Sequence, residues 1–268
     1  MAHYTYLTLT RSGATVTCTL ANPPRQTLVA AEVSELQEFL HALETEPDVR
    51  VVVFTGAGEG VFIAHYDVGE LAAGSESQEW LPPHSEGTRL HDLHRLILSM
   101  RASRLITIAA INGSTAGGGL EFALGCDFRL AQDGPFQLGL PEINIGLIPG
   151  AGGTQHYARL LGTARALELI LRGVLMSPRE ALEAGLVHRV HDGDSFVREV
   201  AAFAADLGSR APVALAAAKR AIYDGADLPI DQALAAEQSQ LERCMRSEDA
   251  AGAMRSYLRN EPWTWKGR

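Results

Sequence analysis

The 268-residue chain, with 46% hydrophobic and 21% charged side chains, has the composition of a soluble globular protein with one large core. Its net charge of −9 argues against a nucleic-acid partner, because nucleic-acid affinity depends on Lys and Arg that neutralise phosphates. The three cysteines lie far apart, the N-terminus does not resemble a signal peptide, and no long apolar run occurs. We therefore expect no metal site, no disulfide framework, no membrane association and a cytoplasmic location.

The first part of the chain alternates between strand-like and helical patterns. Threonines alternate with apolar residues over 15–20, as in a half-buried strand, and residues 33–43 carry apolar side chains at helical spacing. Two continuous apolar runs, 51–55 and 105–111, are typical of strands buried on both faces. This order of elements predicts an α/β fold.

Two later regions depart from this alternation. Residues 69–88 mix small, acidic and proline residues, and we expect them to form a long connection over a pocket. After about residue 205 the pattern is helical only, with Ala-rich helices predicted at 212–224, 230–246 and 248–260. We therefore expect residues 1–205 to form the core and residues 206–268 to form a helical region that packs against a neighbouring subunit.

The two most glycine-rich stretches each contain a glutamate. Gly117-Gly-Gly119 follows the predicted strand 105–111 and precedes a helix that carries Glu121 in its first turn, while Glu142 lies within residues 138–155. Carboxylates among apolar residues are costly without a purpose, and a pair of them suits general acid–base chemistry. Alternatively, Glu121 only stabilises the helix dipole. No glycine pattern continues into a nucleotide-binding motif.

Taken together, these stretches closely resemble the crotonase superfamily, in particular enoyl-CoA hydratases. The similarity rests on residues 108–127, on Pro141-Glu142, on 146–155, and on 62–67, and it extends over nearly the whole chain. It implies a ClpP/crotonase-like spiral of ββα units with a C-terminal helical trimerisation region, and a homotrimer or a dimer of trimers. The substrate would be an acyl-CoA thioester, with no cofactor beyond its coenzyme A moiety.

The resemblance also implies roles for individual residues. The backbone N–H groups of Ala64 and Gly118 would hold the thioester oxygen in an oxyanion hole. Glu121 and Glu142 would position one water molecule and add it across the double bond of a 2-enoyl-CoA. The alternatives are a Δ3,Δ2-enoyl-CoA isomerase or another reaction of the family, or a non-catalytic subunit that binds coenzyme A or RNA.

Contacts to the substrate or to coenzyme A are expected at Arg25, Phe62, His65, Asp67, Tyr257 and Arg259. His65 stands where the family commonly has glycine, and Tyr257 and Arg259 would reach the cofactor of a neighbouring subunit. The acyl pocket is expected from residues 66–100, where the resemblance is poorest.

Other polar groups are expected to be structural. His84, His91 and His94 lack the carboxylate or cysteine support of a metal site. Asp127 is expected to make a structural hydrogen bond between helix and strand, and Trp263 and Trp265 to pack against a neighbouring subunit or within the tail.

Overall fold

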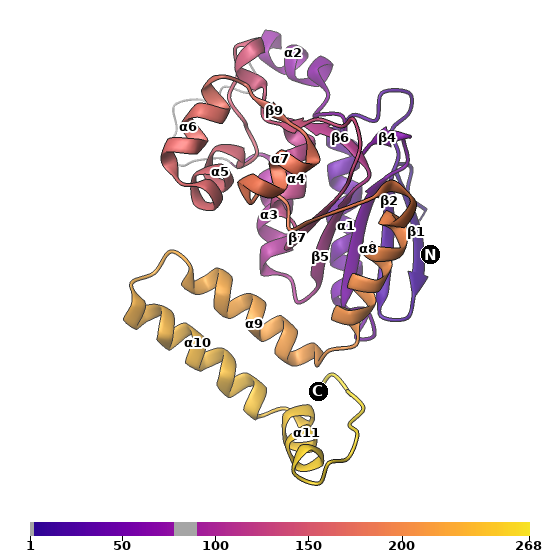
Figure 1. The fold of residues 1–268 in the computed structure, drawn as a ribbon, viewed down its shortest axis with the longest axis vertical. Coiled ribbons are helices and arrows are strands. Elements are labelled where there is room, and N and C mark those ends of the chain that lie inside the picture. Colours follow the sequence, from indigo (N-terminus) through magenta and orange to yellow (C-terminus); the bar gives the residue numbers. More distant parts are fainter. Residues whose placement is uncertain (1–2, 78–89) are drawn as a thin grey trace.

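The structure is a computed structural model that describes residues 3–77 and 90–268 (Figure 1). Its larger sheet has six strands in the order β1-β2-β3-β5-β7-β10, of which β1 and β2 pair antiparallel and the others parallel. These strands are β1 (Leu7–Ser12), β2 (Thr15–Leu20), β3 (Val51–Gly56), β5 (Ile106–Ile111), β7 (Phe128–Gln132) and β10 (Arg189–His191).

The smaller sheet has the order β4-β6-β8-β9, with β8 and β9 antiparallel. Its strands are β4 (Gly60–Val61), β6 (Gly113–Ala116), β8 (Leu138–Gly139) and β9 (Leu175–Met176). Each turn of the chain therefore adds one strand to each sheet and then a helix: β3 with β4, β5 with β6, and β7 with β8. The spiral of ββα units is confirmed.

The helices cover both faces of the larger sheet. On one face, α1, α3 and α4 enclose a core that includes Phe39, Leu96 and Phe122, all buried. On the other face, α8 packs Phe196, Val200 and Ala204 against β3 and β5. The helices of this part are α1 (Ala30–Glu44), α2 (Val68–Ser77), α3 (Asp92–Ala102), α4 (Gly118–Gly125), the 3-10 helix η1 (Glu142–Ile145), α5 (Gly153–Leu161), α6 (Thr163–Leu171), α7 (Pro178–Ala184) and α8 (Gly193–Gly208).

The C-terminal part is helical, as the sequence predicts: α9 (Pro212–Gly225), α10 (Ile230–Met245) and α11 (Glu248–Leu258) extend away from the sheets (Figure 1). The expected division at residue 205 falls inside the last turn of α8. Buried Lys219 on α9 fastens this extension to the core, because its Nζ lies 2.8 Å from Oδ2 of Asp127 and donates to two backbone carbonyls. Asp127 also accepts from Thr107, so its predicted structural role is confirmed.

The tail after α11 packs back on that helix. Trp263 lies against Gly252 and donates to Asp249, which confirms its predicted packing role.

The expected long loop at 69–88 is wrong in its first half, because residues 69–77 belong to α2. Residues 78–89, including His84, lie outside the described part of the chain. Among the described residues, no single helix has the length and hydropathy of a membrane span; α8 and α9 reach both only as a pair bent by 100°.

Candidate active site

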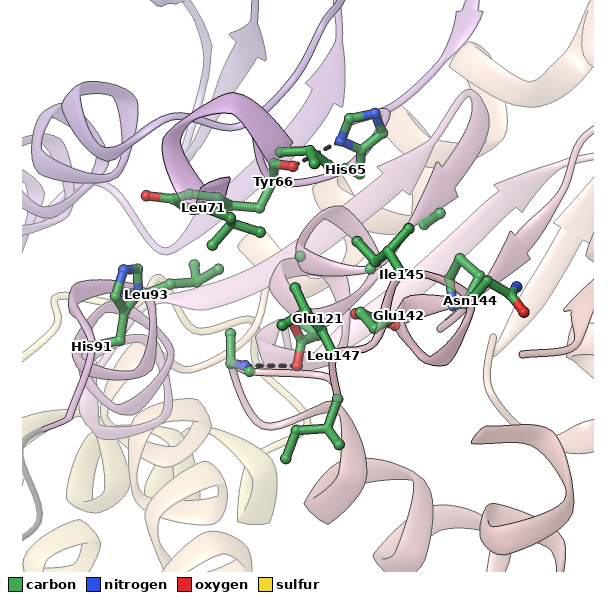
Figure 2. A pocket seen from close by; sticks show the side chains of 18 of the residues that line it. His65, Tyr66, Leu71, His91, Leu93, Glu121, Glu142, Asn144, Ile145 and Leu147 are labelled. Carbon is green, nitrogen blue, oxygen red and sulfur yellow. Dashed lines mark hydrogen bonds between the residues drawn. The ribbon is translucent and has the colours of Figure 1, made fainter. Parts of the chain in front are cut away.

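A cavity of about 650 Å³ lies where the first turns of several elements meet (Figure 2). Its polar lining includes both candidate glutamates, His65 and His91. Apolar side chains from α2, α3 and the segment after Glu142 form most of the remaining wall: Val68, Leu71, Leu93, Ile145, Leu147 and Ile148. The expected pocket region 66–100 therefore supplies only one side of the cavity.

Glu121 is the fourth residue of α4 and its side chain is buried. Its Oε1 accepts hydrogen bonds from the backbone N–H groups of Ala151 and Gly153, both at 2.7 Å (Figure 2 shows the bond to Ala151). Gly153 begins α5, so the carboxylate lies at the positive end of that helix. Burial raises the pKa of Glu121, and the amides of Gly153, Ala151 and Gly150 oppose that rise. The amides therefore favour the charged form.

Glu142 is the first residue of η1 and lies in a different environment. Both of its carboxylate oxygens are buried, and neither has a hydrogen-bond partner among the described residues. Burial, with a smaller contribution from the charge of Glu121, raises the pKa of Glu142 to about 7. The two carboxylates at this cavity thus differ in their surroundings: backbone amides bind Glu121, whereas no other described residue donates to Glu142.

The glycine triplet brings backbone close to these carboxylates. Gly117 has φ +49, and a side chain there would place its Cβ 3.1 Å from Oε1 of Glu142. The next residue, Gly118, begins α4, and a Cβ on it would lie 2.7 Å from Cβ and 3.3 Å from the backbone N of Tyr66. The backbone N–H groups of Gly118 and Tyr66 have no acceptor among the described residues.

The predicted role of the Ala64 amide is wrong. Its N–H donates to the carbonyl of Gln26 at 2.9 Å, and its own carbonyl accepts from Ala116 at 3.0 Å. Both backbone polar groups of Ala64 are therefore used in hydrogen bonds that join its segment to Gln26 and to Ala116 of β6. Two residues further along, the N–H of Tyr66 is the one that lies beside Gly118.

His65 lines the cavity and fixes the backbone next to it. Its Nδ1 lies 2.7 Å from the carbonyl oxygen of Tyr66 (Figure 2). A carbonyl oxygen can only accept, so Nδ1 carries the proton, and in the neutral ring Nε2 keeps its lone pair.

Two further candidates serve the fold. Phe62 is 1% exposed and packs near Phe122 in the core, so its predicted contact with substrate is wrong. The carboxylate of Asp67 accepts from the N–H of Glu70 in the first turn of α2 and from Thr27. These bonds, led by that of Glu70, lower the pKa of Asp67.

The remaining candidates lie on the surface. Arg25 is exposed and does not line the cavity. Tyr257 and Arg259 are exposed at the far end of the C-terminal extension (Figure 1 shows α11 far from α2). Within one chain, the structure does not bring Tyr257 and Arg259 to the cavity.

The part of the chain that the structure describes contains no group of His, Cys, Asp and Glu side chains able to hold a metal ion. His91 precedes α3, and its Nδ1 accepts from the N–H of Leu93. Half-buried His94 carries a lowered pKa, because partial burial disfavours its charged form.

Comparison with known proteins decides the family. The family model for enoyl-CoA hydratase/isomerase matches residues 10–268. The chain belongs to this family. The predicted resemblance is confirmed, and with it the prediction that the chain is an enzyme of the crotonase superfamily.

Individual members of the family align over most of their length. YngF of Bacillus subtilis, named as an enoyl-CoA hydratase/isomerase, is 34% identical over 93% of both chains. The short-chain-enoyl-CoA hydratase of Clostridium acetobutylicum is 31% identical, again over 93% of both chains. The crystal structure of an enoyl-CoA hydratase from Bacillus anthracis superposes with a TM-score of 0.89 at 32% identity, covering 98% of this chain and 100% of that one.

Sequence reasoning missed two parts of this family member's site. Tyr66 was not singled out, because the choice of free amide depends on how residues 26–28 pair with 64–67. The apolar wall formed by Leu147 and Ile148 was also missed, although both residues lie inside the second glycine-rich stretch.

Proposed function

We propose that the protein adds water across the double bond of a 2-enoyl-CoA thioester, with Glu121 and Glu142 as the catalytic residues. The observation that supports this most strongly is the contrast between the two carboxylates at one cavity. Glu121 is held by backbone amides, and Glu142 is desolvated without partners. Such a pair supplies a base and an acid at the same pH.

The geometry supports a separate role for each glutamate. Both hydrogen bonds from the amides of Ala151 and Gly153 go to Oε1 of Glu121, which leaves Oε2 to take a proton from water. The resulting hydroxide attacks Cβ of the substrate, and Glu142 in its protonated form, favoured by its pKa of about 7, delivers a proton to Cα. Glu121 then releases to solvent the proton that it took from water, and Glu142 takes up a proton from solvent, so both carboxyls regain their starting states.

Charge that develops on the thioester oxygen needs hydrogen-bond donors. We assign these to the N–H groups of Tyr66 and Gly118, because they adjoin each other and have no acceptor among the described residues. Gly118 also lies at the N-terminus of α4, where the helix dipole favours negative charge. Loss of one such donor typically lowers kcat by about 10²–10³-fold.

Coenzyme A is the remaining part of the substrate, and no cofactor beyond it is proposed. We place its polar portion near Arg25, and contacts from a neighbouring subunit at Tyr257 and Arg259. Both of the latter are exposed on or just after α11. This arrangement requires an oligomer, and we propose a homotrimer or a dimer of trimers.

The test is hydration of crotonyl-CoA, followed by loss of the absorbance of the conjugated thioester. Glu121→Gln and Glu142→Gln should each lower kcat by about 10²-fold or more, since general acid–base catalysis contributes that much. Glu183→Gln, at an exposed position on α7, is the matched control and should behave as wild type. Unchanged rates in both active-site variants would remove the two glutamates from the mechanism, and a wild type that turns over no enoyl-CoA would support a non-catalytic protein.

The same assay separates hydration from isomerisation. An isomerase would convert a 3-enoyl-CoA to the conjugated 2-enoyl-CoA and leave crotonyl-CoA unchanged. Turnover of a 3-enoyl-CoA without hydration of any 2-enoyl-CoA would overturn the proposal.

A further inference from the structure

Tyr66 contributes two different groups to the cavity. Its backbone N–H lies beside Gly118, where the thioester oxygen is placed by the proposed function. Its side chain runs in another direction, along the cavity wall past Leu71 and towards His91 (Figure 2). Tyr66 thus places its N–H at the proposed position of the thioester oxygen and its ring in the wall of the acyl site.

The position of the Tyr66 ring is fixed by its surroundings. Its Cβ lies so close to Gly118 that no side chain fits there, and the His65 imidazole holds the carbonyl of the same residue. The far edge of the ring meets the His91 ring edge-to-face, with centroids 5.6 Å apart and an interplanar angle of 76°. Because Tyr66 is only 8% exposed, the ring cannot swing away without opening the site.

Among the large apolar and aromatic side chains of the cavity wall, Tyr66 and Leu93 are the least exposed, at 8% and 1%, and we call this part the closed end; the wall after Glu142 is the open end. Ile145 and Ile148 are 56% and 69% exposed, so their side of the cavity faces outward. Leu93 is buried, and the Tyr66 ring lies on its side of the cavity. A pantetheine arm carries amides that need polar partners or water, whereas a hydrocarbon tail gains from the apolar closed end. The acyl tail therefore belongs beside Tyr66, Leu71 and Leu93.

We propose that Tyr66 determines the acyl-chain specificity of this site, because its ring is a rigid wall that limits how long or how bulky an acyl group the closed end accepts. This inference rests on the proposed function, which places the thioester oxygen at the Tyr66 amide. The amide is unaffected by the identity of the side chain. Shortening that side chain should change which acyl groups fit while the oxyanion donor remains.

The expected change can be stated as a ratio. Tyr66→Ala opens space at the closed end, and each methylene newly buried there is worth roughly fourfold in binding. The preference for octenoyl-CoA over crotonyl-CoA, as a ratio of kcat/KM, should therefore rise by about tenfold to a hundredfold relative to wild type. Tyr66→Phe keeps the ring and should keep the wild-type ranking of chain lengths.

The experiment uses two readouts on the intact protein. The first is kcat/KM for 2-enoyl-CoAs with four, six, eight and ten acyl carbons, and the second is Kd for the matching saturated acyl-CoAs by calorimetry. Leu98→Ala, which trims an exposed side chain on the same helix as Leu93, is the control. If Tyr66→Ala does not fold, Tyr66→Leu also removes the ring and should shift both profiles in the same direction.

The two readouts separate this inference from the proposed function. Identical chain-length profiles in wild type and the ring-less variants, with hydration intact, would overturn the role of Tyr66 alone. A shifted Kd profile without hydration by wild type would support the role of Tyr66 and overturn the hydratase.

Discussion

The two glutamates at the cavity differ in their hydrogen bonds, although burial raises the pKa of both carboxyls. The amides of Ala151 and Gly153 replace water around one oxygen of Glu121 and make its charge less costly. No other described residue donates a hydrogen bond to Glu142, so burial, opposed chiefly by the residue's own backbone N–H, raises its pKa to about 7. The difference arises from backbone geometry at the start of α5 rather than from side-chain partners.

The assignment of Glu142 as the acid predicts the pH dependence of the rate. The carboxyl must be protonated to deliver a proton, so kcat should fall as pH rises through its pKa of about 7. Glu142→Gln carries no titratable group, and its residual rate should lose this alkaline decline. Stopped-flow or steady-state rates of crotonyl-CoA hydration across neutral pH give the measurement. An alkaline limb that persists unchanged in Glu142→Gln would assign the decline to another group.

Among the elements, the N-terminus of α4 contains residues that suit the site but have a low helix propensity. Alanine is favoured over glycine inside helices by about 1 kcal/mol, yet Gly117, Gly118 and Gly119 stand in succession where α4 begins. The reason is proximity: a Cβ on Gly118 would overlap Tyr66. Glycine at position 118 therefore allows the close contact with Tyr66, although it does not stabilise the helix.

Gly118→Ala therefore makes a prediction for α4. The added methyl group must displace the Tyr66 peptide, so the two N–H groups would no longer converge and kcat should fall by about 10²-fold. The Tm should change little, because the better helix former offsets part of the local strain. Gly208→Ala at the end of α8 is the control, since its Cβ would meet Ala14 at an ordinary 3.4 Å. Wild-type kcat in Gly118→Ala would remove this contact from the catalytic site.

The strands and helices that could be predicted from the sequence are those with a regular pattern of apolar residues. Strands β3 and β5 are buried on both faces and so read as continuous apolar runs. Helix α2 was missed because it has no buried residue and hence no apolar stripe. The two-residue strands β4, β8 and β9 are too short to carry any period.

The site residues also separate into those that a sequence pattern marks and those that it does not. Glu121, Glu142 and Gly118 could be located because glycine-rich stretches of recognisable sequence surround them. The errors at Ala64 and Phe62 concern where the backbone N–H and the side chain point, which a sequence motif does not specify. The Ala64 amide turns to Gln26, and the Phe62 ring turns into the core. We assign to the Tyr66 amide the role that the sequence predicted for the Ala64 amide.

At the scale of the molecule, the C-terminal extension is attached to the core, but the core does not cover the apolar side chains of α10. The buried ion pair of Lys219 with Asp127 holds α9 in place, while α10 has no buried residue. Ile230, Leu234, Leu241 and Met245, which recur on one face of α10, are all more than half exposed. An apolar face of this length on a projecting helix is typical of an interface between subunits.

Charge placed on that face should separate the subunits. In Leu234→Glu/Leu241→Glu, two carboxylates would have to be buried in the proposed interface, at a cost of several kcal/mol unless paired. Light scattering after gel filtration should give three or six times 28.8 kDa for wild type and 28.8 kDa for the variant.

The control adds the same two charges to the opposite face of α10, as Gln232→Glu/Ser239→Glu, and should keep the wild-type mass. If Tyr257 and Arg259 reach a neighbour's coenzyme A, the separated variant should show a raised KM with a smaller change in kcat. A monomeric wild type, or a double variant that stays assembled, would show that the apolar face of α10 has another purpose.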